Sequence, residues 1–154
     1  MNWTFALYYY KDSSNLNEAL FQKIMHSIYW QIHHVYHNIN FSRIAVRNNH
    51  AITETLVLYL SGLLFPFIPE AKKWSKAGKK WFEQEIDYQI YKDGTFLQYS
   101  MNYHRVAIQL LTWGIRLSEI HKDKFSDVVY DKAKKSLEFL DASQDPVSKE
   151  LPNY

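Results

Sequence analysis

Residues 47–65 read RNNHAITETLVLYLSGLLF, and this stretch decides the fold. Its second half is apolar at nearly every position, which is typical of a helix that neighbouring elements cover on all sides. Its first half brings amides, an imidazole and a carboxylate to the entrance of that helix, at Asn48, Asn49, His50 and Glu54. Polar groups at the edge of a buried helix need a partner or a ligand, so this entrance is a candidate functional site.

A second polar cluster lies at residues 99–104, YSMNYH, where another periodic apolar pattern begins. Ser100 is a residue type that caps helix N-termini, and a helix is predicted to follow it. Tyr103 and His104 then fall in the first turn of that helix. The two clusters therefore place similar side chains at the starts of two helices.

Periodic apolar positions predict helices along the rest of the chain as well. The predicted helices, including the two above, cover residues 3–10, 16–38, 50–65, 70–91, 101–121 and 126–140. Pro66 and Pro69 separate the third from the fourth, the dipeptide at residues 93–94 ends the fourth, and Ser126 is the expected cap of the sixth. No strand is predicted. The pattern indicates an all-α fold of antiparallel helix pairs, as in bundles, solenoids and toroids.

Composition limits the function. The chain has 154 residues, enough for one core, and its 18 Lys and Arg against 16 Asp and Glu are too balanced and dispersed to predict nucleic-acid binding. Cysteine is absent, which excludes disulfides and thiolate metal sites. Aromatic residues are 17% of the chain, including 12 Tyr and 5 Trp. Such rings suit a carbohydrate groove, although most of them are expected to fill a helical core.

No membrane partner and no metal are predicted. The most apolar run, residues 56–68, is shorter than the roughly 20 residues of a membrane span and contains Pro66. Residues 1–4 do not resemble a secretory signal, which leaves a cytoplasmic location open. His33 and His37 have a metal-binding spacing but no identifiable third ligand, so a polar helix face is the simpler interpretation.

Read together, the two clusters resemble the heparinase II/III-like family of polysaccharide lyases. The matching positions extend from the first cluster to the second: Asn48, Asn49, His50, Ala51, Glu54, residues 56–66, Ala71, Trp74, Gly78, Glu85, Gln89, Asp93, Gly94, Ser100, Tyr103 and His104. One position departs from the family pattern, because Gln98 stands where an acidic residue is expected before the serine. The resemblance covers roughly residues 41–121.

The resemblance implies that residues 1–141 form part of an (α/α) toroid, truncated at its N-terminal end, and that residues 142–154 link it to a β-sandwich domain outside this chain. It implies a bacterial enzyme, periplasmic or secreted, that cleaves a uronate-containing polysaccharide such as a glycosaminoglycan or alginate by β-elimination. No cofactor is implied. A further basic catalytic residue is expected outside this segment, so the isolated chain is expected to be inactive.

The resemblance also implies roles for the site residues. Asn49 and His50 match the group that contacts the uronate carboxylate, and Tyr103 matches the tyrosine that transfers protons. These types suit the reaction, because an amide and an imidazolium can neutralise the carboxylate while a phenol acts as base or acid. Asn48, His104 and Glu54 are predicted to contact substrate.

Simpler interpretations remain open for these residues. Asn48 and Asn49 could only cap a helix, Tyr103 could be a core aromatic, and Glu54 could orient His50 or be exposed. The alternative function is a non-catalytic carbohydrate-binding helical domain of a polysaccharide synthesis or modification system. Either way, an open toroid segment is expected to expose apolar surface and to self-associate.

Overall fold

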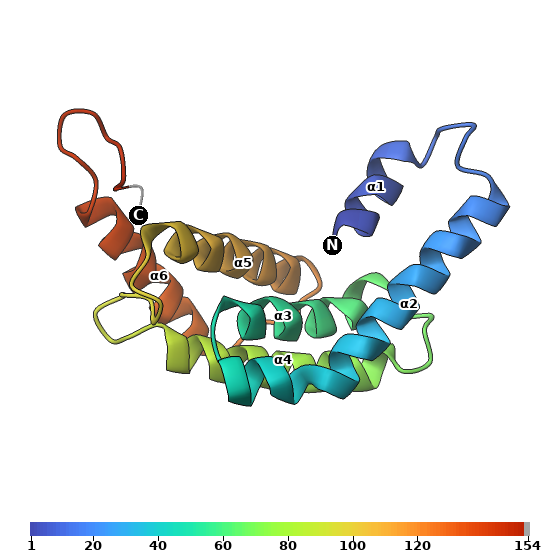
Figure 1. Ribbon diagram of the computed structural model, residues 1–154, viewed down its shortest axis with the longest axis horizontal. Coiled ribbons are helices and arrows are strands. Elements are labelled where there is room, and N and C mark those ends of the chain that lie inside the picture. The colour runs from blue at the N-terminus through green and yellow to red at the C-terminus, as the bar shows by residue number, and fades with distance from the viewer. Residues whose placement is uncertain (153–154) are drawn as a thin grey trace.

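The computed structural model describes residues 1–152, which are helical in most of their length (Figure 1). The elements are α1 (Asn2–Tyr10), α2 (Glu18–Asn40), the π-helix η1 (Phe41–Val46), α3 (Asn49–Leu64), α4 (Ala71–Gln89), α5 (Met101–Ile120) and α6 (Asp127–Ala142). Within residues 1–152 the extended pairing consists of an isolated bridge between Ile90 and Phe96. The all-α prediction is confirmed. Asn153 and Tyr154, at the end of the predicted linker, lie outside the described residues.

Helix α3 is the centre of the fold. It contacts α2, η1, α4 and α5, which explains why its sequence is apolar nearly all round. Its buried side chains face several directions: Ala51, Ile52, Thr55, Leu56, Leu58, Tyr59, Leu60 and Ser61. The prediction of a helix covered on every side is confirmed.

Helices α3 and α4 run antiparallel and lie very close together (Figure 1). Gly78 permits this approach, because a Cβ there would lie 2.3 Å from the backbone nitrogen of Tyr59. Beside it, the hydroxyl of Ser75 donates a hydrogen bond to the backbone oxygen of Tyr59 at 2.7 Å. The first polar cluster lies at the start of the α3 helix of this pair.

Two groups of buried side chains lie around this pair. One joins α3 and α4 to α5 and α6, and it contains Ile52, Phe82, Leu111 and Val129. The other joins them to α2 through Ile24, Ile28, Ile32 and Ile39. These four isoleucines recur at helical spacing and form the buried stripe of α2, whereas Leu20 near the start of the helix is 41% exposed. In Figure 1, α3, α4 and α5 lie together in the middle of the molecule, with α1 and α2 on one side and α6 on the other. Closure of helix pairs into a toroid stays a prediction.

The structure differs from the prediction between α2 and α3. The expected short connection is instead the π-helix η1, which continues α2 directly. Its last hydrogen bond runs from the backbone nitrogen of Arg47 to the oxygen of Ser42 at 2.7 Å. Arg47 itself has φ 47° and ψ 59°, a left-handed conformation that ends η1 and turns the chain toward α3.

Two predicted helix ends also need correction. Helix α4 stops at Gln89, before residues 93–94, because the chain turns there into the extended bridge at Ile90. Ser126 stands at the N-cap position of α6, but its side chain makes no capping hydrogen bond. Its backbone N–H instead donates to the Glu83 carboxylate of α4 at 2.7 Å.

None of the helices in residues 1–152 combines the length and the apolarity that crossing a bilayer requires.

Candidate functional site

The starts of α3 and α5 are joined by a side chain. The Oε1 atom of Gln98, in the loop before α5, accepts a hydrogen bond from the backbone nitrogen of Asn49 at 3.1 Å. Asn49 is the first residue of α3, so its N–H has no partner within the helix. The contact brings the two polar clusters of the sequence together, although about fifty residues separate them.

Both helices begin with side-chain caps. Asn48 Oδ1 accepts from the backbone nitrogen of His50 at 3.0 Å, and Ser100 Oγ accepts from that of Tyr103 at 3.5 Å. The simpler interpretation of Asn48 as a helix cap is therefore confirmed, and so is the predicted cap at Ser100. The caps fix the direction in which the first turn of each helix presents its side chains.

The Asn49 side chain is not used as a cap. Its Oδ1 atom is buried and accepts no hydrogen bond from the described residues, while its backbone oxygen accepts from the Thr53 hydroxyl at 2.9 Å. Asn49 as a whole is half-buried. A buried carbonyl oxygen without a donor is unusual in a folded protein and is more common at functional sites.

His50 and Tyr103 are accessible. His50 is exposed in the first turn of α3, and Tyr103 is 46% exposed in the first turn of α5. The alternative interpretation of Tyr103 as a core aromatic is wrong, because nearly half of its surface faces solvent. An imidazole and a phenol are therefore both accessible at the two helix starts.

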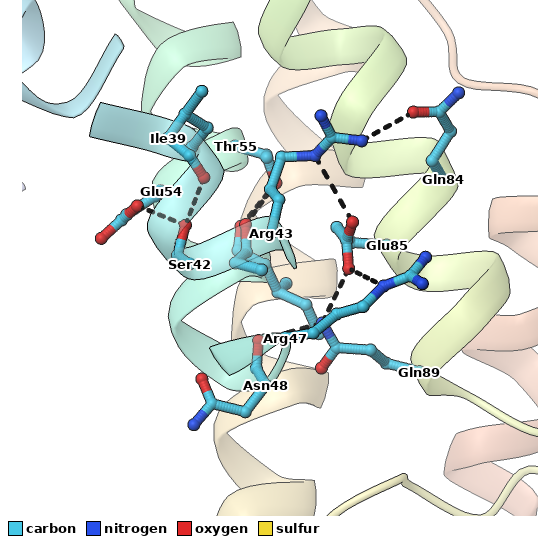
Figure 2. A network of polar contacts seen from close by, with 12 residues as sticks. Ile39, Ser42, Arg43, Arg47, Asn48, Glu54, Thr55, Gln84, Glu85 and Gln89 are labelled. Carbon is cyan, nitrogen blue, oxygen red and sulfur yellow. Dashed lines mark hydrogen bonds and ion pairs between the residues drawn. The ribbon is translucent and has the colours of Figure 1, made fainter. Parts of the chain in front are cut away.

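The Glu54 carboxylate hydrogen-bonds to Ser42 and not to His50. Its Oε2 atom accepts from the Ser42 hydroxyl at 2.6 Å, which links α3 to the start of η1 (Figure 2). Ser42 is itself buried. The structure therefore pairs Glu54 with Ser42 and gives no support to the interpretation that it orients His50.

His104 lies inside the protein. It is 2% exposed, its Nε2 atom hydrogen-bonds to the hydroxyl of Ser136 in α6, and its ring stacks on Phe139 with centroids 5.3 Å apart. Burial lowers the pKa of His104 below its ordinary value. The sequence predicts a substrate contact for His104, but in this geometry it holds α5 against α6, and we propose no substrate contact for it.

Beneath the start of α3 lies a charged network that the sequence interpretation missed (Figure 2). Glu85 of α4 has no exposed surface, and its carboxylate lies 3.4 Å from Arg43 Nε and 3.5 Å from Arg47 Nε. Each guanidinium also lies over an aromatic ring of α4, 4.9 Å from the centroid of Trp81 and 3.3 Å from that of Tyr88. The available signal was an acidic residue on the buried stripe of an amphipathic helix, since such a residue needs a buried cation.

Gln89 connects this network to the site. Its Nε2 atom donates to Glu85 Oε2 at 3.1 Å and to the backbone oxygen of Asn48 at 2.9 Å (Figure 2). Its backbone oxygen accepts from the nitrogen of Leu97 at 2.8 Å, beside Gln98. The cap of α3 and the loop before α5 are thus both bonded to the end of α4.

The hollows differ in how they relate to this site. One of about 150 Å³ lies at the start of α5 and is lined by Thr95, Phe96, Tyr99, Ser100, Met101, His104 and Phe139. A hollow of about 680 Å³ lies at the far end of α3, and four lysines of α4 line it together with Gly62, Leu63, Pro66, Ser75, Glu83 and Asp123. None of the predicted site residues lines it. His33 and His37 have ring centroids 4.3 Å apart on α2. Among residues 1–152, no three His, Cys, Asp or Glu side chains gather as a metal site requires.

Comparison with known proteins places the chain in a family. A curated protein named heparin-sulfate lyase, from Bacteroides stercoris, is 26% identical over 97 residues, which are 62% of this chain and 15% of that protein. The chain thus matches a small part of that relative. No solved structure matches it significantly. Residues 1–143 match the family model described as Heparinase II/III N-terminus, so the resemblance is confirmed and the chain belongs to the heparinase II/III N-terminal family.

Proposed function

We propose that this chain is the helical portion of a polysaccharide lyase that cleaves a uronate-containing glycosaminoglycan by β-elimination. Family membership and the relative named heparin-sulfate lyase support this class of activity. The observation that carries the proposal is the hydrogen bond between Gln98 and Asn49, because it joins the helix starts that bear Asn49, His50 and Tyr103. Lyases of this kind act outside the cytoplasm, so a periplasmic or secreted location is part of the proposal.

The chemistry assigns a task to each residue. Removal of the proton at C5 of a uronate is difficult because the neighbouring carboxylate already carries a full charge. The Asn49 amide and the His50 imidazole donate hydrogen bonds to that carboxylate and to the charge that develops on it. Preorganised donors of this kind commonly contribute about 3–4 kcal/mol each to transition-state stabilisation.

Tyr103 is the proposed proton carrier. As phenolate it removes the C5 proton, and as phenol it protonates the glycosidic oxygen of the leaving sugar, so that the C4–O bond breaks as the C4–C5 double bond forms. A basic residue outside this chain is proposed to assist it. The isolated chain is accordingly proposed to bind oligosaccharide without turning it over.

The second candidate function is a helical domain that binds polysaccharide and does not cleave it. The uncharged Gln98, at a position where the family resemblance implies an acidic residue, favours this candidate. The two candidates differ in what Tyr103 contributes. A binding domain tolerates loss of the Tyr103 hydroxyl, whereas a lyase keeps its affinity and loses turnover.

The test is an elimination assay on the full-length protein, with ultraviolet absorbance reporting the unsaturated uronate. Heparan, chondroitin, hyaluronan and alginate are compared as substrates. Tyr103→Phe is expected to lower kcat by 10²-fold or more, the range for loss of a proton-transfer group, with oligosaccharide affinity unchanged. Tyr10→Phe, an exposed tyrosine of α1, is the matched control. Absence of product on every substrate, with glycan binding retained, would favour the binding domain.

A further inference from the structure

The buried carboxylate of Glu85 fixes the geometry of the segment that leads into α3. Its side chain is 0% exposed, whereas those of its partners Arg43 and Arg47 are 17% and 40% exposed. A carboxylate removed from water is unfavourable unless cations and donors surround it, so the two guanidinium groups and the Gln89 amide are required where they lie. Glu85 thus defines where α4 meets residues 43–47.

The backbone of Arg47 is held in a left-handed conformation by contacts of its side chain. Its backbone is left-handed, with φ 47°, although it carries a Cβ that disfavours this conformation. Its side chain lies between the Glu85 carboxylate and the ring of Tyr88, 3.3 Å from the ring centroid. Because Asn48 and Asn49 follow directly, the conformation of Arg47 sets the direction in which α3 starts.

Gln89 links the Glu85 carboxylate to the segments that precede both α3 and α5. Its side-chain nitrogen donates hydrogen bonds to Glu85 and to the backbone oxygen of Asn48, and its backbone oxygen accepts one from the nitrogen of Leu97. The residue after Leu97 is Gln98, whose side-chain oxygen accepts a hydrogen bond from the backbone nitrogen of Asn49. Residues 96–98 lead into the first turn of α5, which bears Tyr103. One buried acid therefore supports the relative placement of Asn49 and Tyr103.

We propose that Glu85 and Gln89 are positioning residues of the lyase site, acting through the backbone of Asn48 and Asn49 and through the loop before α5. This inference rests on the proposed function, because it concerns the alignment of that function's residues. Glu85 is enclosed, so it acts on substrate only through other groups. Small displacements are enough for such an effect, since a misplacement of about 1 Å can lower a rate by about 10²-fold.

The test uses the full-length protein with Glu85→Gln, which keeps the shape and removes the charge, and Gln89→Met, which keeps the length and removes the amide. Both variants are expected to lower kcat by at least about tenfold at a temperature where each is folded, with oligosaccharide affinity changed less than about threefold. Asp87→Asn is the matched control, because Asp87 is on the same helix and its side chain is 65% exposed. It is expected to keep the wild-type kcat.

A multiple-variant comparison separates positioning from a general loss of structure. If Glu85 acts by placing Asn49 and Tyr103, then Glu85→Gln added to a protein that already carries Asn49→Ala and Tyr103→Phe lowers the residual kcat by less than about twofold further. An equal loss in both backgrounds would overturn the inference.

Amide hydrogen exchange supplies a measure that does not depend on turnover. Glu85→Gln is expected to speed exchange about tenfold or more at residues 47–50 and 96–103, with residues 24–36 of α2 unchanged. Unchanged exchange at the two helix starts would overturn the inference, as would faster exchange with an unaltered kcat. If the wild-type protein cleaves nothing, the proposed function fails, and exchange alone decides whether Glu85 positions these residues.

Discussion

Gln98 and Asn49 are bonded across the two helix starts, with the side-chain oxygen of Gln98 3.1 Å from the backbone nitrogen of Asn49. The N–H at the first position of α3 is one of the groups that a helix cannot satisfy itself. Gln98 is therefore an external cap of α3 supplied by the loop before α5. The family resemblance expects an acid here, and the geometry explains why, since a carboxylate can accept the same hydrogen bond.

This relationship predicts that Gln98→Glu stabilises the protein. A carboxylate near a helix N-terminus interacts favourably with the helix dipole by about 0.3–1 kcal/mol, and the gain should disappear near pH 4, where Glu protonates. Gln98→Met should instead cost about 1 kcal/mol through loss of the hydrogen bond. Urea unfolding at pH 7 and pH 4 measures both changes. Gln109→Glu, on the exposed side of α5, is the control and should change little. A destabilised Gln98→Glu variant would contradict the capping role.

The buried His104 predicts a pH dependence of stability. Burial lowers its pKa in the folded protein below the ordinary value of 6.5, so the unfolded chain binds a proton more readily below that pH. Its contribution to the free energy of unfolding is therefore complete above pH 6.5 and is lost as the pH falls from there through the folded-state pKa. Its facing groups on α6 are Ser136 and Phe139, which carry no charge.

The measurement compares unfolding free energies at pH 7.5 and pH 5.0. Between these pH values the free energy of unfolding should fall further for the wild-type protein than for His104→Gln. This holds even if the variant is already less stable at pH 7.5. His26→Gln on the exposed face of α2 is the control and should keep the wild-type difference. An equal pH difference in the His104 variant would show that other groups cause the effect.

The surface of α1 predicts self-association of the isolated chain. Helix α1 has no fully buried residue, and a hollow of about 450 Å³ opens among Phe5, Tyr9, Leu64 and Trp113. Apolar surface of this kind favours association. Light scattering should therefore show a mass that rises with concentration. Tyr9→Glu should shift the profile toward monomer, whereas Tyr99→Glu, equally exposed beside α5, should not. A monomeric wild-type profile at high concentration would contradict the prediction.

The sequence by itself determined the helices and most of their limits. Residues 47–65 are apolar nearly all round, and this pattern requires cover on every side, which α2, α4 and α5 provide. Asn48 and Ser100 are capping residue types at the helix starts where the structure shows them capping. Such features depend on neighbours within a few residues in the chain, so a sequence read in order contains them. The π-helical turn at residues 41–46 was missed, because it follows from how α2 meets α3 and not from local composition.

Only the tertiary structure decided what the polar residues do. Glu54 bonds to Ser42, twelve positions earlier, His104 bonds to Ser136, thirty-two positions later, and Glu85 pairs with arginines that precede it by about forty positions. Each of these side chains could have faced solvent or a ligand, and its burial depends on which helix packs against it. Local pattern fixes the face of a helix on which a residue lies. The partner across that face is chosen by packing between segments far apart in the chain, and this choice separates an accessible Tyr103 from the enclosed His104 beside it.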